Sequence, residues 1–526
     1  MKYIDNPILT GFNPDPSIIR VENDFYIATS TFEWFPGVQI HHSRDLQNWE
    51  LIARPLERLS QLNMKGNAAS AGVWAPCLSY HDGTYYLVYT DMKQKDGRWR
   101  DLHNYLVTSE DITGNWSEPV YLNSSGIDPS LFHDPEGEKW LVNMIWDHRQ
   151  QHTFAGIILQ EYLPEEQKLT GPIKNIFEGT ELGYTEGPHL YKRNGYYYLI
   201  TAEGGTGYGH AVTMARSRQI DGPYRVHPHN PVLTSRDNSG LELQKAGHAD
   251  IVETQNGEWY LVHLCGRPLE ERGRCTLGRE TAIQKMVWRE DWLYAEEGGN
   301  QPRLRVPAPD LPEEKPVVDK QKKYYDFSGD SLDIDFQSLR VPLDEDTLSL
   351  KDRPGYLRLK GHESPSSRFQ QSLVARRWKH FRFEAETCVE FSPQSFQQMA
   401  GLICYYDELD FYYLRITHNK EAGNTLGIIS CVNGDYDVEA APEIDISACE
   451  QIYLKVKVDF DQLQFYYAKD GDSWEKIGSL LDAGKLSDEE AVGCFTGAFV
   501  GLCCQDLSGR NQYADFEYFS YEVAED

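Results

Sequence analysis

Three acidic residues and a histidine recur at matching places in five similar stretches of the sequence. The stretches are PDPSIIRVENDFYIATS from Pro14, WAPCLSYHDGTYYLVYT from Trp74, DPSLFHDPEGEKWLVNM from Asp128, EGPHLYKRNGYYYLITA from Glu186 and GHADIVETQNGEWYLVHL from Gly247. Aligning them places Asp15, Ala75, Asp128, Glu186 and His248 in one column. Clustered carboxyl groups repel one another, so at least one should hold a proton near neutral pH. An acid beside a base is the pair that cleavage of a glycosidic bond needs.

The elements that must position these residues are short β-strands. Each stretch has an apolar pair, a turn with Asn-Asp, Asp-Gly, Glu-Gly or Asn-Gly, and then an aromatic-rich strand, which is typical of a β-hairpin. The aligned residues recur every 53–62 positions, enough for a four-stranded blade with loops. The sequence therefore predicts a five-bladed β-propeller over residues 1–306, whose innermost strands bring the column together around one axis. A pair of β-sandwiches with chance similarity is the alternative.

The amino-acid composition of the sequence changes after the fifth stretch. Residues 307–325 include PAPDLPEEKPVVDKQKK, which is rich in proline and charge and indicates a linker. Residues 326–526 again alternate in strand fashion, as in FRFEAETCVEF and QIYLKVKVDF. Their length and turn spacing predict a β-sandwich. The fold class expected is all-β, a propeller followed by a sandwich.

Composition excludes several classes of function. The formal charge of −30 and the pI of about 4.9 disfavour binding to nucleic acid or to an anionic membrane. No apolar run reaches the roughly 20 residues of a membrane-spanning helix. The N-terminal residues carry no pattern of a secretion signal, so we expect a cytoplasmic location and reduced thiols at all ten cysteines.

FNPDPS, VWAPCL, IDPSLF, TEGPHL and LGRETAIQK, in this order, resemble the motifs of family 43 β-xylosidases. STFEWFPGVQIHHSRDL and FTGAFVGLCCQD resemble the two-domain branch of that family, whose second domain is a concanavalin-like sandwich. The resemblance covers essentially the whole chain. It implies an inverting, exo-acting xylan 1,4-β-xylosidase that releases xylose from the non-reducing ends of xylobiose and xylo-oligosaccharides. Side activity on α-L-arabinofuranosides is also expected.

The resemblance also implies roles for individual residues. Asp15 matches the general base, Glu186 the general acid and Asp128 the residue that orients the acid and tunes its pKa. Expected substrate-binding residues are Arg279, Phe32, Trp74, Trp146, His248 and Phe499, the last on a loop of the second domain that reaches over the pocket. No cofactor is implied as a requirement, and the resemblance leaves room for a calcium ion beside His248. A homo-oligomer, a dimer or tetramer, is expected.

Purely structural roles for some of these residues, and other functions for the chain, are also compatible with the sequence. Arg279 could simply pair with Glu280, and the tryptophans could belong to the core. An α-L-arabinofuranosidase would use the same scaffold and the same acids. A β-fructosidase is disfavoured because no Arg-Asp-Pro or Glu-Cys motif stands in the matching stretches. A carbohydrate-binding protein without catalysis is disfavoured because three clustered carboxyl groups cost stability that binding alone does not require.

Overall fold

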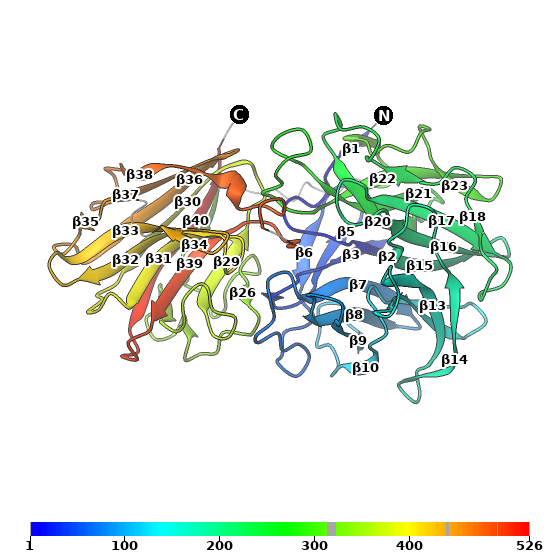
Figure 1. The fold of residues 1–526 in the computed structure, drawn as a ribbon, viewed down its shortest axis with the longest axis horizontal. Helices are drawn as coiled ribbons and strands as arrows, with labels where there is room; N and C mark the ends of the chain where they lie inside the picture. The colour runs from blue at the N-terminus through cyan, green and yellow to red at the C-terminus, as the bar shows by residue number, and fades with distance from the viewer. Residues whose placement is uncertain (1, 313–321, 438–440, 492, 525–526) are drawn as a thin grey trace. The chain divides into compact units, whose positions relative to one another are not determined.

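The structure is a computed structural model that describes residues 2–312, 322–437, 441–491 and 493–524. Within these residues it is built of β-strands and one 3-10 turn, η1 (Ala483–Lys485). It divides into two compact units. Unit 1 comprises Met1–Leu62, Ala71–Arg272 and Arg279–Val317, and unit 2 comprises Asn63–Ser70, Gly273–Gly278 and Val318–Asp526. In Figure 1 the colours of unit 1 run mainly from blue to green and those of unit 2 mainly from yellow to red.

Unit 1 is the predicted five-bladed propeller, and each blade is an antiparallel sheet of strands that follow one another along the chain, except that one short strand outside the sheet interrupts blade one (Figure 1). Blade one contains β2 (Ser17–Val21), β3 (Asp24–Thr29), β5 (Gln39–Ser43) and β6 (Glu50–Ala53). Blade two contains β7 (Gly72–His81), β8 (Thr84–Gln94), β9 (Asp101–Ser109) and β10 (Val120–Asn123). Blade three contains β11 (Ser130–His133), β12 (Lys139–Trp146), β13 (Phe154–Leu163) and β14 (Lys168–Phe177).

The last two blades complete the ring. Blade four contains β15 (Glu186–Arg193), β16 (Tyr196–Glu203), β17 (Ala211–Ser217), β18 (Arg225–Val226) and β19 (Leu233–Thr234). Blade five contains β20 (Gln244–Glu253), β21 (Trp259–Gly266), β22 (Glu280–Arg289) and β23 (Trp292–Ala295). β1 (Tyr3–Asp5) pairs with β24 (Arg305–Pro307), and β4 (Trp34–Phe35) is a short strand after blade one's second.

Hydrophobic clusters join neighbouring blades. One contains Ile200 of blade four and Leu261 of blade five, and another contains Ile27 of blade one and Val262 of blade five. Alternate side chains of a strand point to opposite faces of its sheet. Each blade can therefore pack against a neighbouring blade on either face. Burial of apolar surface between blades therefore fixes each innermost strand next to the axis.

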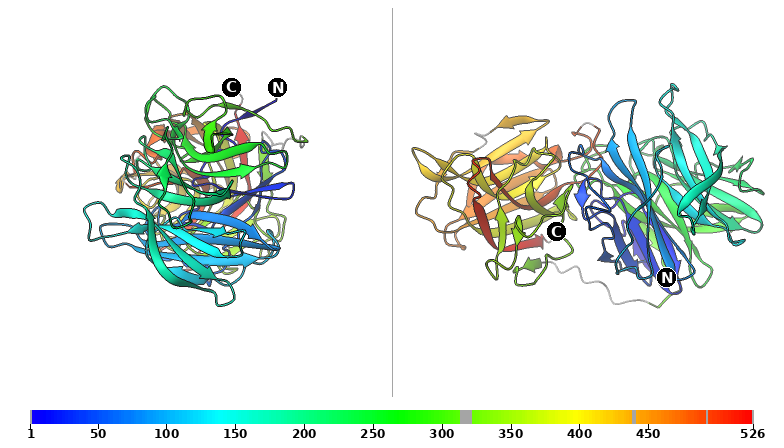
Figure 2. Two further views of the ribbon diagram at one scale, coloured as in Figure 1. Left: turned by 90° about the vertical axis from the view of Figure 1, so that its right-hand side faces the viewer. Right: turned by 90° about the horizontal axis from the view of Figure 1, so that it is seen from below.

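Unit 2 contains the predicted sandwich (Figure 2). One sheet has the order β27-β28-β40-β30-β36-β37-β38, with β25 beside β40, and the other has β29-β39-β31-β32-β33-β34, with β35 beside β33. Their bounds are β25 (Lys322–Tyr325), β27 (Leu348–Ser349), β28 (Leu357–Lys360), β29 (Ser372–Arg377), β30 (Arg382–Glu390), β31 (Gln398–Tyr405), β32 (Phe411–Asn419), β33 (Gly423–Val432), β34 (Asp435–Asp437), β35 (Ile444–Asp445), β36 (Ile452–Asp459), β37 (Gln462–Ala468), β38 (Glu475–Asp482), β39 (Phe499–Asp506) and β40 (Tyr513–Val523). A further short strand is β26 (Ser338–Leu339).

The division of the chain is less simple than the sequence suggested. The segments 63–70 and 273–278, expected within the propeller, cluster with the sandwich, where Arg340 donates to the Asn67 carbonyl (2.7 Å) and to Glu408 (2.8 Å). The predicted linker, 307–325, is narrower on both sides because Pro307 ends β24 and Lys322–Tyr325 forms β25. Residues 313–321 of that linker lie outside the described residues. Within the described chain, no helix is long and apolar enough to cross a membrane.

Candidate active site

The innermost strands of the five blades begin in the same way. In each blade we take one residue of the innermost strand as the start of the ladder: Ser17, Cys77, Ser130, His189 and Asp250, which pair with Ala28, Val88, Val142, Ile200 and Val262; in blade five the preceding Ala249 also pairs, with His263. Two residues before each start lies a residue with positive φ: Asp15 (52°), Ala75 (35°), Asp128 (56°), Gly187 (56°) and His248 (41°). We call these five the first ring and the five ladder starts the second ring. A left-handed residue repeated five times is a costly conformation of the kind that gathers at functional sites.

The sequence alignment was wrong by one residue in the fourth repeat. The first-ring residue of blade four is Gly187, and Glu186 precedes it, because Gly187-Pro188 corresponds to Asp15-Pro16. A side chain here would fit tightly, since a Cβ on Gly187 would lie 3.1 Å from the His248 ring. Glu186 pairs with Ala202 and is followed by an irregularity in the ladder. The Glu186 side chain therefore extends from the residue before the first-ring position, whereas Asp15 and Asp128 occupy that position themselves.

Few hydrogen bonds stabilise the three carboxyl groups. Asp15 accepts one at Oδ2 from the Ser30 hydroxyl (2.7 Å), and its Oδ1 lies 3.7 Å from His248 Nδ1. Asp128 accepts one at Oδ2 from the backbone N–H of Gly187 (2.9 Å), the residue next to Glu186. Among the described residues, none donates a hydrogen bond to the carboxyl group of Glu186. These acids therefore keep most of their hydrogen-bonding capacity for another molecule.

Electrostatics favour the protonated forms of two of these acids. Burial and the charge of Asp15 raise the pKa of Asp128 to about 8, opposed by the Gly187 N–H. Burial, Asp128 and Asp15 hold the pKa of Glu186 well above its usual range, opposed by Arg279 and Arg100. A carboxylic acid that stays protonated at neutral pH can act as a general acid. The arrangement therefore combines a proton donor with carboxylates that can accept a proton.

Arg279 is placed beside the strand that leads to Asp15. Its carbonyl accepts a hydrogen bond from the Asn13 N–H (2.8 Å), and its side chain interacts electrostatically with Glu186. The residue is buried, 5% exposed. The competing interpretation, pairing with Glu280, is weakened because Arg267 binds both oxygens of Glu280, at 2.6 and 2.8 Å. Arg279 thus faces the acids with a guanidinium suited to sugar hydroxyls.

His248 and the neighbouring His210 are buried and electrically neutral. Burial lowers the pKa of His248, and burial with the charge of His248 and Arg279 lowers that of His210 to about 3. His210 was not singled out from the sequence, which carries no signal for it; in the structure a Cβ on Gly247 would meet the His210 ring at 1.9 Å. The His248 imidazole therefore packs against Gly187 of the first ring, and the His210 imidazole packs against Gly247, the residue before His248.

The surroundings of His248 fit a calcium ion poorly. Calcium prefers six to eight oxygen ligands. The carboxylate of Asp15 is the one recorded at ion-pair distance from His248, and across the described residues no three His, Cys, Asp or Glu side chains form a metal-binding group. We therefore derive no step through a metal.

The predicted aromatic residues lie in different settings. Phe32 and Val73 exchange two backbone hydrogen bonds (both 3.0 Å), and the Phe32 and Trp74 rings meet edge to face at 5.9 Å. Phe32 is buried and Trp74 is partly exposed. Trp146 ends β12 with the guanidinium of Arg100 stacked 3.9 Å from its ring centroid. Phe499 does not lie on a loop as expected: it is the first residue of strand β39 of unit 2, fully buried and near Arg377, and its role in substrate binding stays a prediction.

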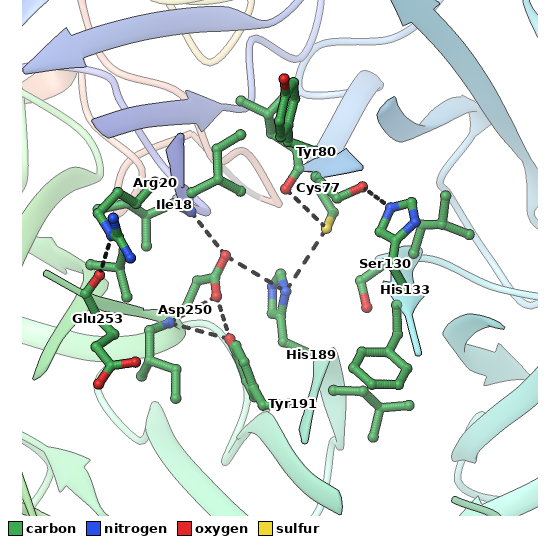
Figure 3. Close-up of a pocket in the computed structure, with 18 of the residues that line it drawn as sticks. Ile18, Arg20, Cys77, Tyr80, Ser130, His133, His189, Tyr191, Asp250 and Glu253 are labelled. Carbon is green, nitrogen blue, oxygen red and sulfur yellow. Dashed lines mark hydrogen bonds and ion pairs between the residues drawn. The ribbon is translucent and has the colours of Figure 1, made fainter. Parts of the chain in front are cut away.

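Four of the five second-ring residues, Cys77, Ser130, His189 and Asp250, help to line a cavity of about 400 Å³ (Figure 3). Asp250 binds Ser17 of blade one, Tyr191 of blade four and two backbone N–H groups, of Ile18 (2.9 Å) and Ile251 (2.8 Å). His189 Nδ1 lies 3.7 Å from Asp250 and 4.0 Å from Cys77 Sγ. Burial raises the pKa of the Cys77 thiol to about 12, so it is not a nucleophile. This ring connects blades rather than offering reactive groups.

Comparison with known proteins agrees with this geometry. Residues 4–293 match the model of glycosyl hydrolases family 43, and residues 324–522 match the β-xylosidase C-terminal concanavalin A-like domain. The chain is 53% identical to a β-xylosidase of Bacillus subtilis (99% of both chains) and 52% identical to xylosidase/arabinosidase 43B of Humicola insolens (99% and 98%). A crystal structure of xylan β-1,4-xylosidase from Bacillus halodurans superposes with a TM-score of 0.97 at 56% identity, over 99% of this chain and 100% of that one. This chain therefore belongs to glycosyl hydrolase family 43.

Proposed function

We propose that this protein is an exo-acting, inverting β-D-xylosidase that releases xylose from the non-reducing ends of xylobiose and xylo-oligosaccharides. The observation that carries the proposal is the environment of Glu186, an acid with a raised pKa between two aspartates and two arginines. The likeness to proteins named β-xylosidase over almost the whole length of both chains supports the choice of sugar.

The proposed reaction uses three residues in distinct roles. Glu186 gives its proton to the leaving oxygen as the glycosidic C–O bond breaks. Asp15 takes a proton from the water that attacks the anomeric carbon; its Oδ2 is held by Ser30, which leaves Oδ1 for the water. Asp128 holds the Gly187 N–H and so orients the adjacent acid. Arg279 binds sugar hydroxyls beside Glu186.

The test is a proton NMR time course of xylobiose with the purified protein. We expect α-xylose to appear first and then to mutarotate, since attack by water inverts the anomeric centre. Early β-xylose would mean a covalent intermediate and would remove Asp15 from the role of base. Absence of hydrolysis would overturn the proposed activity.

A second activity, on α-L-arabinofuranosides, is favoured by the likeness to the Humicola insolens xylosidase/arabinosidase. The same acids would serve both substrates. We expect turnover of 4-nitrophenyl α-L-arabinofuranoside to be lower than that of 4-nitrophenyl β-D-xyloside. The opposite order would make arabinofuranosidase the principal activity.

A further inference from the structure

Arg100 has an unusual position for a charged residue. It ends the loop between β8 and β9, and its guanidinium carbon lies 3.9 Å from the centroid of the Trp146 ring. Its Nε is buried, and none of its N–H groups donates to another described residue. Its remaining interactions are electrostatic, with Glu186 and Asp96. A guanidinium has five N–H donors, and leaving them without acceptors is costly unless a bound molecule supplies acceptors.

Several contacts hold the Trp146 ring under Arg100 in place. Trp146 donates from Nε1 to the Arg98 carbonyl (3.0 Å) and from its backbone N–H to Ser125 (2.8 Å). Its ring meets Phe154 edge to face at 5.5 Å, and Phe154 meets Tyr184 in the same way at 5.4 Å. Tyr184 lies two residues before Glu186. A continuous aromatic wall thus runs from Arg100 to the segment that carries the general acid.

This wall is open to solvent at both ends. Trp99, next to Arg100, is 73% exposed and packs against His148 in a tilted arrangement with the ring centroids 4.0 Å apart, and Tyr184 is 56% exposed. The leaving group of an exo-acting enzyme extends outward, and its oxygen must lie beside the general acid. The side of Glu186 that carries an exposed wall is therefore suited to the leaving group.

Four charged side chains act on Glu186: Asp15, Asp128, Arg279 and Arg100. Three of them correspond to residues with roles at the cleaved sugar or in proton transfer. Arg100, in contrast, comes from the blade-two loop between β8 and β9, and its guanidinium lies over the Trp146 ring. The stacked guanidinium also covers a face of Trp146 that a sugar ring would otherwise use.

We propose that Arg100, seated on Trp146, donates hydrogen bonds to hydroxyls of the leaving-group sugar and thereby makes the enzyme prefer oligosaccharides over aglycones without hydroxyls. Trp146 then supports the arginine and is not itself the main sugar contact. This inference rests on the proposed function and specifies the residue that recognises the leaving group.

The experiment compares kcat/KM of Arg100→Met with that of the wild-type enzyme on xylobiose and on 4-nitrophenyl β-D-xyloside. Methionine keeps an unbranched apolar chain on Trp146 but removes the donors. We expect a loss of about tenfold or more on xylobiose and less than about threefold on the aryl xyloside, whose leaving group has no sugar hydroxyls. Arg100→Lys, which retains charge without a planar fork, should recover part of the loss.

Arg98→Met is the matched control, because Arg98 lies in the same loop, is exposed and donates to the His148 carbonyl (3.1 Å). It should leave the ratio of the two kcat/KM values unchanged, and thermal melting should show that all variants fold. Equal losses on both substrates would reduce Arg100 to a general electrostatic partner of Glu186, and no loss on xylobiose would also overturn the proposal. Wild-type enzyme inactive on xylobiose would instead overturn the proposed function.

Discussion

Buried carboxyl groups occur in both the first and the second ring, but they differ in how many hydrogen bonds they accept. Asp250 of the second ring accepts four hydrogen bonds, from Ser17, Ile18, Tyr191 and Ile251. Asp15 and Asp128 of the first ring accept one hydrogen bond each from described residues. Corresponding residues of the two rings lie two residues apart along the chain, at the beginnings of the innermost strands. A carboxylate surrounded by donors stabilises the fold, whereas one with few donors and neighbouring negative charge is available for chemistry.

The largest expected effect tests whether Glu186 and the first-ring residue Asp15 take part in catalysis. Glu186→Gln should lower kcat on xylobiose by about 10²–10⁴-fold, because the amide cannot protonate the leaving oxygen. The loss should be much smaller on aryl xylosides with activated leaving groups. Asp15→Asn should lose activity on both substrates, since the base is needed whatever the leaving group. Normal cleavage of xylobiose by Glu186→Gln would assign the acid elsewhere.

Asp250→Asn should instead affect stability. An asparagine amide brings N–H donors against the donors that surround Asp250, so we expect a loss of about 3 kcal/mol in the free energy of unfolding. Urea denaturation of the variant and the wild type would measure it. A variant of normal stability would show that the second ring does not hold the blades together.

Asp128→Asn should change the stability of the protein in a pH-dependent way, and at higher pH it should be favourable relative to the wild type. Folding raises the pKa of Asp128 from its usual 3.8 to about 8 and so favours its protonated form. The wild type therefore has its full contribution from this group below about pH 4 and loses it as the pH rises to 8. The melting temperature of the variant, relative to wild type, should rise by a few degrees between pH 4 and pH 8. A difference that stays constant with pH would contradict this origin of the shift.

The smallest expected effect concerns the glycine that displaces Glu186 from the first ring. Gly187→Ala combines a positive φ with a Cβ 3.1 Å from His248, whereas Gly83→Ala has φ +80° and no atom within 4 Å of the added Cβ. Each should lose about 1–2 kcal/mol from the left-handed conformation. Only Gly187→Ala should also lower kcat/KM, because His248 lies beside Asp15. Matching activities in the two variants would mean that the His248 contact tolerates the methyl group.

The site could be predicted from the sequence as far as the repeats extend. Asp15, Asp128 and His248 occupy equivalent positions because each stretch carries its own turn and strand signals. Glu186 was aligned one residue away from its place, because matching acidic residue types outweighed the Gly-Pro pair that follows. Arg100 was missed because it lies in a loop outside the repeats and its main contact is a stacked ring.

The sequence by itself determined the number of blades and the presence of a second β-domain and indicated the candidate acids, since local alternation, turn residues and repeats encode strands without reference to distant contacts. The tertiary structure decided which acids change their pKa, since burial and neighbouring charge come from different blades. It also decided that Glu280 binds Arg267 rather than Arg279, and that Asp250 is saturated while Asp128 is not. These differences depend on which donors the closed ring of blades brings to each carboxylate, a property that no single stretch contains.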